Sequence, residues 1–147
     1  MKELTVTSSA FKNNQHIPEK YTCVGEGINP PLSIDGIPEG TKSLALIFDD
    51  PDAVGGTFDH WILYNIPPTQ SQIGENSSAG TAALNSDQEP AYAPPCPPPG
   101  KNHRYTFKFY ALDATLTLGA KAAKRDVEKA MKGHILAEGK LVGLFSR

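Results

Sequence analysis

The chain has 147 residues, of which 39% are hydrophobic and 20% are charged, and its formal net charge is −2. This length and composition predict one soluble globular domain, residues 1–147, with a single sizeable core. The near-neutral charge argues against a nucleic-acid binder that works through a basic surface. Residues 44–48 and the other apolar runs are too short to span a bilayer, and residues 1–11 lack an apolar stretch of signal-peptide length. We therefore expect a cytoplasmic protein without a membrane span.

Glycine and proline are abundant, with 13 of each, which favours many turns and short strands. Residues 27–50 predict a loop, a short strand, a turn and a second strand. The turn contains Pro38, which presets its dihedral angle, and Gly40, which tolerates a positive one. The run Ser-Leu-Ala-Leu-Ile-Phe at 43–48 is apolar enough for a buried strand.

Residues 60–66 predict a central strand, because both of its faces are mostly apolar. Strict alternation places His60, Ile62, Tyr64 and Ile66 on one face and Trp61, Leu63 and Asn65 on the other. Residues 69–90 are polar, small and aperiodic and predict a long surface loop. The proline-rich segment, residues 90–99, holds six prolines and predicts a stiff extended wall that leads into the next strand, rather than an interdomain linker.

Residues 103–111 form the clearest strand pattern. One face carries His103, Tyr105, Phe107, Phe109 and Ala111, and the other carries Arg104, Thr106 and Lys108. Residues 120–133 predict a helix with a buried stripe at Ala123, Val127, Ala130 and Met131, ended by Gly133. Residues 134–147 predict one or two short closing strands. The fold class is therefore mainly β, with one short helix near the C-terminus.

The chemistry-bearing residues that remain are Asp50, Asp52, His60, His103 and Tyr105. Taken singly, each has an ordinary explanation as a turn aspartate, a satisfied histidine or a core tyrosine. Together, two inward-facing histidines beside a phenol and an acidic turn suit an anion site. A protonated imidazole is a charged donor near neutral pH, the phenol adds a neutral donor, and an aspartate can orient an imidazole. No nucleophile elbow, phosphate loop or paired-cysteine zinc motif occurs in the sequence, so we expect no catalytic residue, metal or cofactor.

Cys23 and Cys96 are too few for a disulfide scaffold. Two free or buried thiols are favoured, and a disulfide between them remains open because sequence spacing does not determine connectivity.

The segments Asp-Asp-Pro-Asp-Ala at 49–53, His-Trp-Ile-Leu-Tyr-Asn-Ile-Pro at 60–67 and Pro-Pro-Gly-Lys-Asn-His-Arg-Tyr-Thr-Phe-Lys-Phe-Tyr-Ala-Leu-Asp at 98–113 occur here in this order. With residues 28–47 and the ending at 133–147, they resemble the phosphatidylethanolamine-binding protein family, and most closely its short prokaryotic branch, often called Raf kinase inhibitor-like. The resemblance extends over nearly the whole chain, from about Phe11 onward.

This resemblance implies a two-sheet antiparallel β-sandwich with Greek-key topology and a small anion pocket near one end. Carried over by position, the ligand-binding residues are Asp50, Asp52, His60, Pro98, Pro99, His103 and Tyr105. Trp61 lies beside the site but by alternation points to the other face of its strand. The family usually has proline after Asp-Pro-Asp-Ala, whereas this chain has Val54, so we expect a trans bond and a differently shaped loop there. Relatives often form homodimers, which makes a homodimer an expectation here as well.

Three function classes follow from these residues. The leading one is a non-enzymatic protein that binds a phosphate, phospholipid headgroup or carboxylate and has a regulatory role. The second is a protein-interaction module that inhibits a serine protease or a kinase through residues 69–99. The third is a metal-dependent hydrolase in which His60, His103 and Asp50 hold zinc with an open position.

Overall fold

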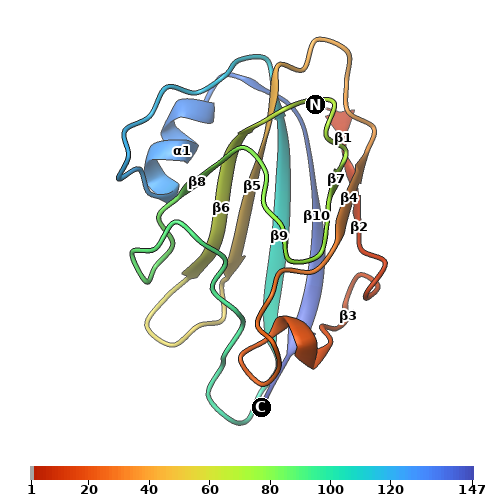
Figure 1. The fold of residues 1–147 in the computed structure, drawn as a ribbon, viewed down its shortest axis with the longest axis vertical. Coiled ribbons are helices and arrows are strands. Elements are labelled where there is room, and N and C mark those ends of the chain that lie inside the picture. Colours follow the sequence, from red (N-terminus) through yellow and green to blue (C-terminus); the bar gives the residue numbers. More distant parts are fainter. Residues whose placement is uncertain (1) are drawn as a thin grey trace.

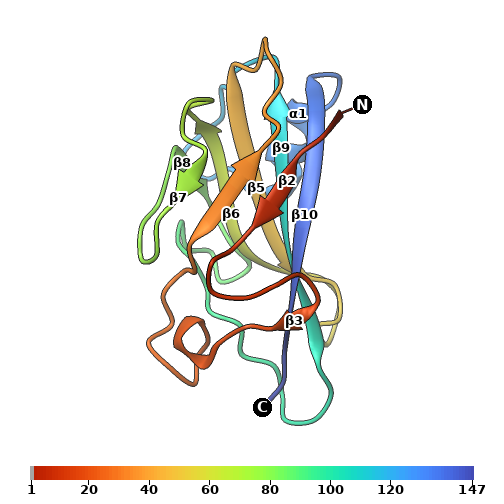
Figure 2. The same ribbon diagram turned by 90° about the vertical axis from the view of Figure 1, so that its right-hand side faces the viewer.

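The computed structural model describes residues 2–147 and contains two β-sheets and one short α-helix (Figures 1 and 2). The larger sheet has the order β1 (Lys2–Glu3), β10 (Ile135–Phe145), β9 (His103–Leu112), β5 (Ser43–Asp50), β6 (Phe58–Ile66), β8 (Thr81–Ala83), with β3 (Gln15–His16) also paired to β10. The smaller sheet has the order β2 (Thr5–Thr7), β4 (Leu32–Asp35), β7 (Gln72–Ile73). A 3₁₀-helix, η1 (Glu19–Tyr21), lies between β3 and β4.

The main strands pair antiparallel, as predicted, while the short β1 and β3 add to β10 in parallel. The predicted mainly β fold with two sheets and a short helix near the C-terminus is thus confirmed. None of the helices described in residues 2–147 has the length and apolar character needed to traverse a lipid bilayer.

The main core lies between the two sheets. Strand β9 supplies Tyr105, Phe107, Phe109 and Ala111 to it, each at most 1% exposed, which confirms the predicted inward face. The smaller sheet supplies Val6, Leu32, Ile34 and Ile73 from the opposite side. Alternation holds along β9 because its pairing with β5 and with the middle of β10 is regular.

A second apolar cluster lies on the other face of the larger sheet, beneath α1 (Lys124–Met131). Val127 and Met131 of the helix are buried there with Ala45, Ile47 and Ile62. The predicted stripe is confirmed at Val127, Met131 and the partly buried Ala130. The helix is shorter than the predicted 120–133, so Ala123 is its N-cap rather than part of the stripe, and Gly133 follows with φ of +85°. Since β5 is covered on both faces, every one of its residues is buried, which explains its continuous apolar run.

The predicted alternation along β6 holds from Trp61 to Tyr64, with Trp61 and Leu63 in the main core and Ile62 and Tyr64 beneath α1. It is wrong at His60 and Ile66, because the strand contains two irregularities. Trp61 pairs with Phe48 and Asp59 pairs with Asp49, which leaves His60 as an extra residue. Such a β-bulge bends the strand and re-aims its side chains. His60 and Trp61 accordingly both lie on the side of Phe48. A second shift occurs near Asn65, whose φ is +54°, and it turns Ile66 into the main core.

Two further sequence predictions need correction. The expected long loop at 69–90 contains strands β7 and β8, which pair with β4 and β6. The expected short closing strands are instead the single 11-residue strand β10. Glycine lowers strand propensity, but Gly139 serves here as a point of close approach, since a Cβ atom on it would lie 2.0 Å from the carbonyl oxygen of Leu4.

Candidate functional site

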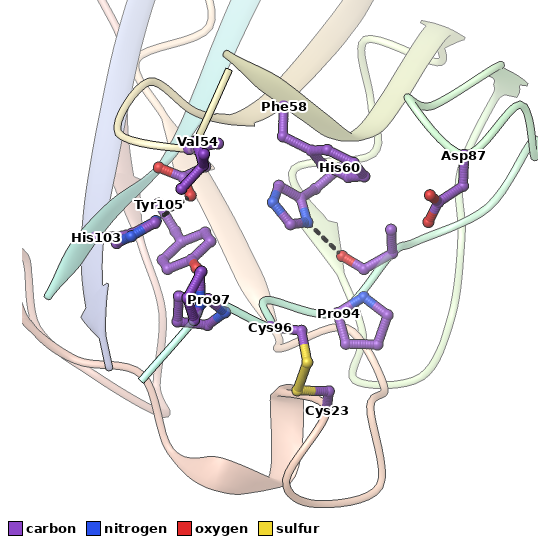
Figure 3. A pocket seen from close by; sticks show the side chains of 14 residues that line it. Cys23, Val54, Phe58, His60, Asp87, Pro94, Cys96, Pro97, His103 and Tyr105 are labelled. Atoms are coloured by element: carbon purple, nitrogen blue, oxygen red, sulfur yellow. Dashed lines mark hydrogen bonds and ion pairs between the residues drawn. A yellow bond between two sulfur atoms is a disulfide. The ribbon is translucent and has the colours of Figure 1, made fainter. Parts of the chain in front are cut away.

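A pocket of about 410 Å³ opens at one end of the sandwich, where the β5–β6 connection, the proline-rich segment and the turn after η1 converge (Figure 3). Among the residues predicted for the site, the lining contains Asp50, His60, Pro98, His103 and Tyr105. Asp52 and Pro99 lie outside the lining. The pocket therefore joins the end of β5, the start of β9 and the bulged part of β6.

His103 and Asp50 form a buried pair on one side of the pocket. The Nδ1 atom of His103 lies 2.7 Å from Oδ2 of Asp50, and the two side chains are 11% and 3% exposed. The other carboxylate oxygen of Asp50 accepts the backbone N–H of Asp52 at 2.8 Å. A carboxylate on Nδ1 fixes the orientation of the imidazole and leaves Nε2 as the free ring nitrogen.

His60 lies across the pocket from this pair (Figure 3). Its Nδ1 atom lies 2.7 Å from the carbonyl oxygen of Ala93, so Nδ1 carries the proton and donates. Its ring packs with centroid distances of 4.6 Å to Phe58 and 5.4 Å to Phe48 and to Tyr105. Burial lowers the pKa of His60 below its ordinary value of 6.5. At neutral pH the imidazole is therefore neutral, and its Nε2 becomes a charged donor only after it takes up a proton.

Tyr105 lies between the two histidines, at ring distances of 5.4 Å from His60 and 6.2 Å from His103. Burial, followed by the nearby carboxylate of Asp50, raises the pKa of its hydroxyl well above the usual range. The phenol therefore stays protonated and remains a hydrogen-bond donor at physiological pH.

Asp52 is turned away from the pocket and holds the β5–β6 connection onto β9. Its carboxylate accepts from Nε and Nη2 of Arg104 at 2.9 and 2.7 Å and from the Arg104 backbone N–H at 2.9 Å. The hydrogen bonds from the Arg104 side chain lower the pKa of Asp52 to about 2. Asp52 thus fixes the loop that carries Asp50 rather than contributing to the lining.

The remaining acids of the β5–β6 region lie on the opposite face of the sheet. Asp49 pairs with Lys108 at 2.9 Å, and Asp59 pairs with Lys124 of α1 at 2.7 Å. These ion pairs attach the helix and the outer sheet face to the strand ends. Because successive residues of a strand point to opposite faces, Asp49 and Asp50 have different roles.

Sequence reasoning missed several lining residues. Cys23 and Cys96 form a disulfide with a Cα–Cα distance of 5.3 Å, so the favoured prediction of two free thiols is wrong. Phe58 and Asp87 also line the pocket. No local pattern marks these residues, because their place in the site depends on how distant loops meet.

Val54 also lines the pocket and is 84% exposed. The bond before it is trans, as expected, since the peptide bonds described in residues 2–147 include no cis bond. Within the same residues, no three His, Cys, Asp or Glu side chains are grouped so that they could hold a metal ion.

Comparison with known proteins gives a consistent family. A family model described as phosphatidylethanolamine-binding protein matches residues 7–146. A UPF0098 protein of Pyrococcus horikoshii is 48% identical over 150 residues, covering 95% of this chain and 75% of the relative. A UPF0098 protein of Methanothermobacter thermautotrophicus is 45% identical over 151 residues, covering 98% of this chain and 99% of the relative.

Solved structures agree. A phosphatidylethanolamine-binding protein homologue from Chlamydia trachomatis superposes with a TM-score of 0.94 at 40% identity, covering 100% of this chain and 99% of its own. YbcL of E. coli, described as a member of the mammalian PEBP family, superposes with a TM-score of 0.91 at 26% identity, covering 99% of each chain. The chain therefore belongs to the phosphatidylethanolamine-binding protein family.

Proposed function

We propose that this protein is a non-enzymatic binding protein for a small phosphorylated or carboxylated group, which it holds between His60 and His103. Family membership supports a binding protein of this type. The observation that carries the proposal is the pair of imidazoles that line one pocket with Nδ1 already engaged, by Ala93 in one case and by Asp50 in the other. Each ring then has Nε2 left for a ligand.

The other lining groups support binding rather than covalent chemistry. The Tyr105 hydroxyl is a neutral donor, and the two cysteines are joined to each other and so provide no thiolate. Among residues 2–147, no lysine or arginine is part of the lining. Without a guanidinium fork to grip an oxyanion in two places, we expect modest affinity.

The experiment is a titration with phosphoethanolamine, followed by NMR of the histidine ring protons at a pH of about 6. The chain has four histidines. His60 and His103 should shift together as ligand is added. His16 and His134, which are outside the pocket lining, serve as internal controls and should not move. Unchanged His60 and His103 signals at millimolar ligand would contradict the proposal.

A second candidate function is a protein-interaction module. The side chains of Val24 and Val54 are 52% and 84% exposed, although both are large and apolar, and they lie beside or in the pocket lining. Contiguous exposed apolar patches mark protein contacts, and these two valines would contribute apolar area to such a contact at the pocket rim. A protease-inhibition or kinase-binding assay with Val54→Ser tests this candidate. A partner that binds the variant and the natural chain equally well does not use this rim.

A further inference from the structure

The Cys23–Cys96 disulfide is part of the pocket wall, and both of its cysteines line the cavity (Figure 3). Both cysteine residues are also exposed to solvent, so we expect a dithiol to reach the disulfide without unfolding the protein. An exposed disulfide is accessible to thiol–disulfide exchange. Because this disulfide also borders the pocket, its oxidation or reduction changes the pocket wall.

The Cys96 side of the bond has few hydrogen bonds around it, although the neighbouring Pro95 and Pro97 are buried. Cys96 stands among Pro94, Pro95, Pro97, Pro98 and Pro99, and proline has no backbone N–H to donate. Two hydrogen bonds from other parts of residues 2–147 reach the middle of this stretch. They run from the Cys23 N–H to Pro95 at 3.1 Å and from Nε of Arg147 to Pro97 at 2.6 Å. The disulfide is the covalent link that keeps the proline-rich segment against the rest of the pocket.

The Cys23 side, in contrast, is firmly anchored. The turn after η1 is closed by hydrogen bonds from Gly25 to Thr22 at 3.1 Å and from Gly27 to Lys20 at 2.9 Å. It is wound so tightly that a Cβ atom on Gly25 would lie 2.3 Å from the carbonyl oxygen of Glu19. When the bond between the two cysteines opens, the proline-rich segment is therefore the part that moves.

Movement of the proline-rich segment alters the ligand-binding groups directly. The carbonyl oxygen of Ala93 in this segment orients His60, and the Ala93 N–H donates to the His60 carbonyl oxygen at 2.9 Å. Pro94, Pro97 and Pro98 of the same segment line the cavity. Loss of the link at Cys96 thus loosens both a wall of the pocket and the support of one imidazole.

We propose that the Cys23–Cys96 disulfide is a redox modification site at which a dithiol reductant switches the pocket from a closed, binding-competent wall to a loosened one. A thiolate of the dithiol attacks one sulfur, forms a mixed disulfide and releases the other cysteine as a thiolate, which takes up a proton. The second thiol of the reductant then displaces the first cysteine in the same way. Two electrons pass from the dithiol, which ends as a disulfide, to the protein, which ends with two thiols.

The test compares the oxidised protein with the protein treated with dithiothreitol under native conditions. Thiol titration should find two thiols after treatment and none before. Hydrogen exchange of the Ala93 amide should become faster on reduction, while the amides of the central strand β5 keep their exchange rates. The double variant C23S/C96S is the matched control, because it should behave like the reduced protein with or without dithiothreitol.

Ligand affinity gives a second readout, which rests on the proposed function. Reduction should weaken phosphoethanolamine binding by roughly threefold to tenfold, as expected if the closed wall is then populated between a third and a tenth of the time. Equal Ala93 exchange in both states, or thiols that dithiothreitol releases only after denaturation, would overturn the redox inference. If neither state binds phosphoethanolamine, the proposed function fails, and the exchange rates still decide the redox inference.

Discussion

At the scale of single residues, His60 is the group whose charge matters most for the proposed binding of an anion. Burial keeps its pKa below 6.5 in the free protein, and a bound anion stabilises the protonated imidazole and raises that pKa. Binding therefore takes up a proton in the pH window between the lowered free value and the raised bound value. The affinity for an anion should be highest below this window and fall as pH rises through it.

This pH dependence can be measured on protein from which inorganic phosphate has been removed. The protein is titrated with phosphoethanolamine at pH values of about 5.5, 7 and 8.5. His60→Gln cannot take up the proton, so the part of the pH dependence that is due to His60 should disappear in this variant. An equally steep pH dependence in His60→Gln would assign the proton to another group.

His60 also links pH to stability. Its pKa is lower in the folded protein than in the unfolded chain, so the unfolded chain binds more protons between the two values. The stability contribution that is linked to neutral His60 should therefore be fully present above about pH 6.5. It should be lost as the pH is lowered toward the pKa of His60 in the folded state. Thermal unfolding of the natural chain and of His60→Gln, followed between about pH 5 and 7, checks this, because the variant should lose less stability on acidification.

Asp87 is a lining carboxylate that, unlike Asp50, has no histidine partner, and it should work against the proposed anion because the lining within residues 2–147 includes no lysine or arginine. Asp87→Asn should tighten the binding of inorganic phosphate by about twofold to fivefold, in line with the strength of exposed charge pairs, and salt should reduce the gain. Calorimetric titration measures this change. Glu89→Gln is the matched control, since Glu89 is exposed nearby but outside the lining, and an equal gain in both variants would point to a general charge effect.

At the scale of elements, β10 depends on glycine to accept the N-terminal strand. A Cβ atom on Gly139 would lie 2.0 Å from the carbonyl oxygen of Leu4 and 2.8 Å from its carbonyl carbon, and backbone atoms cannot move aside as a side-chain tip can. Gly139→Ala should therefore lower the free energy of unfolding by about 1–3 kcal/mol, as overpacking does. Urea denaturation measures the loss. Gly119→Ala is the control, because a Cβ atom there meets nothing within 4 Å.

At the scale of the whole molecule, the disulfide joins positions that are 73 residues apart. Closing so long a loop restricts the unfolded chain, and removing the bond in C23S/C96S should lower the free energy of unfolding by about 2–4 kcal/mol. Denaturant unfolding of the oxidised protein and the variant, with circular dichroism as the signal, provides the comparison. Identical midpoints and slopes would mean that the bond adds nothing to stability.

The disulfide is also typical of oxidising compartments and of intracellular proteins from hyperthermophiles, so the cytoplasmic location stays a prediction.

Sequence patterns predicted well those features that depend on neighbours along the chain. The inward face of β9, the stripe of α1 and the strand at 43–50 follow from local periodicity, and Asp50, His60, His103 and Tyr105 do meet in one pocket. The failures arise where distant parts decide the outcome. A bulge opposite Phe48 turns His60 to the same side as Trp61, the side chain of Arg104 holds Asp52 outside the pocket lining, and the turn after η1 brings Cys23 to Cys96. Periodicity contains no information on these long-range partners.

The burial of β5 on both faces has a consequence for how the protein is made. The strand has β6 close by along the chain, but its other neighbour, β9, ends only at Leu112, and the helix that covers its second face ends at Met131. During synthesis, the β5 edge of a β5–β6 hairpin therefore has no strand partner until most of the polypeptide has left the ribosome. Long-range strand pairs form slowly, and an unpaired apolar edge strand is prone to aggregation. We therefore expect a chaperone to be most useful to the nascent chain at this stage.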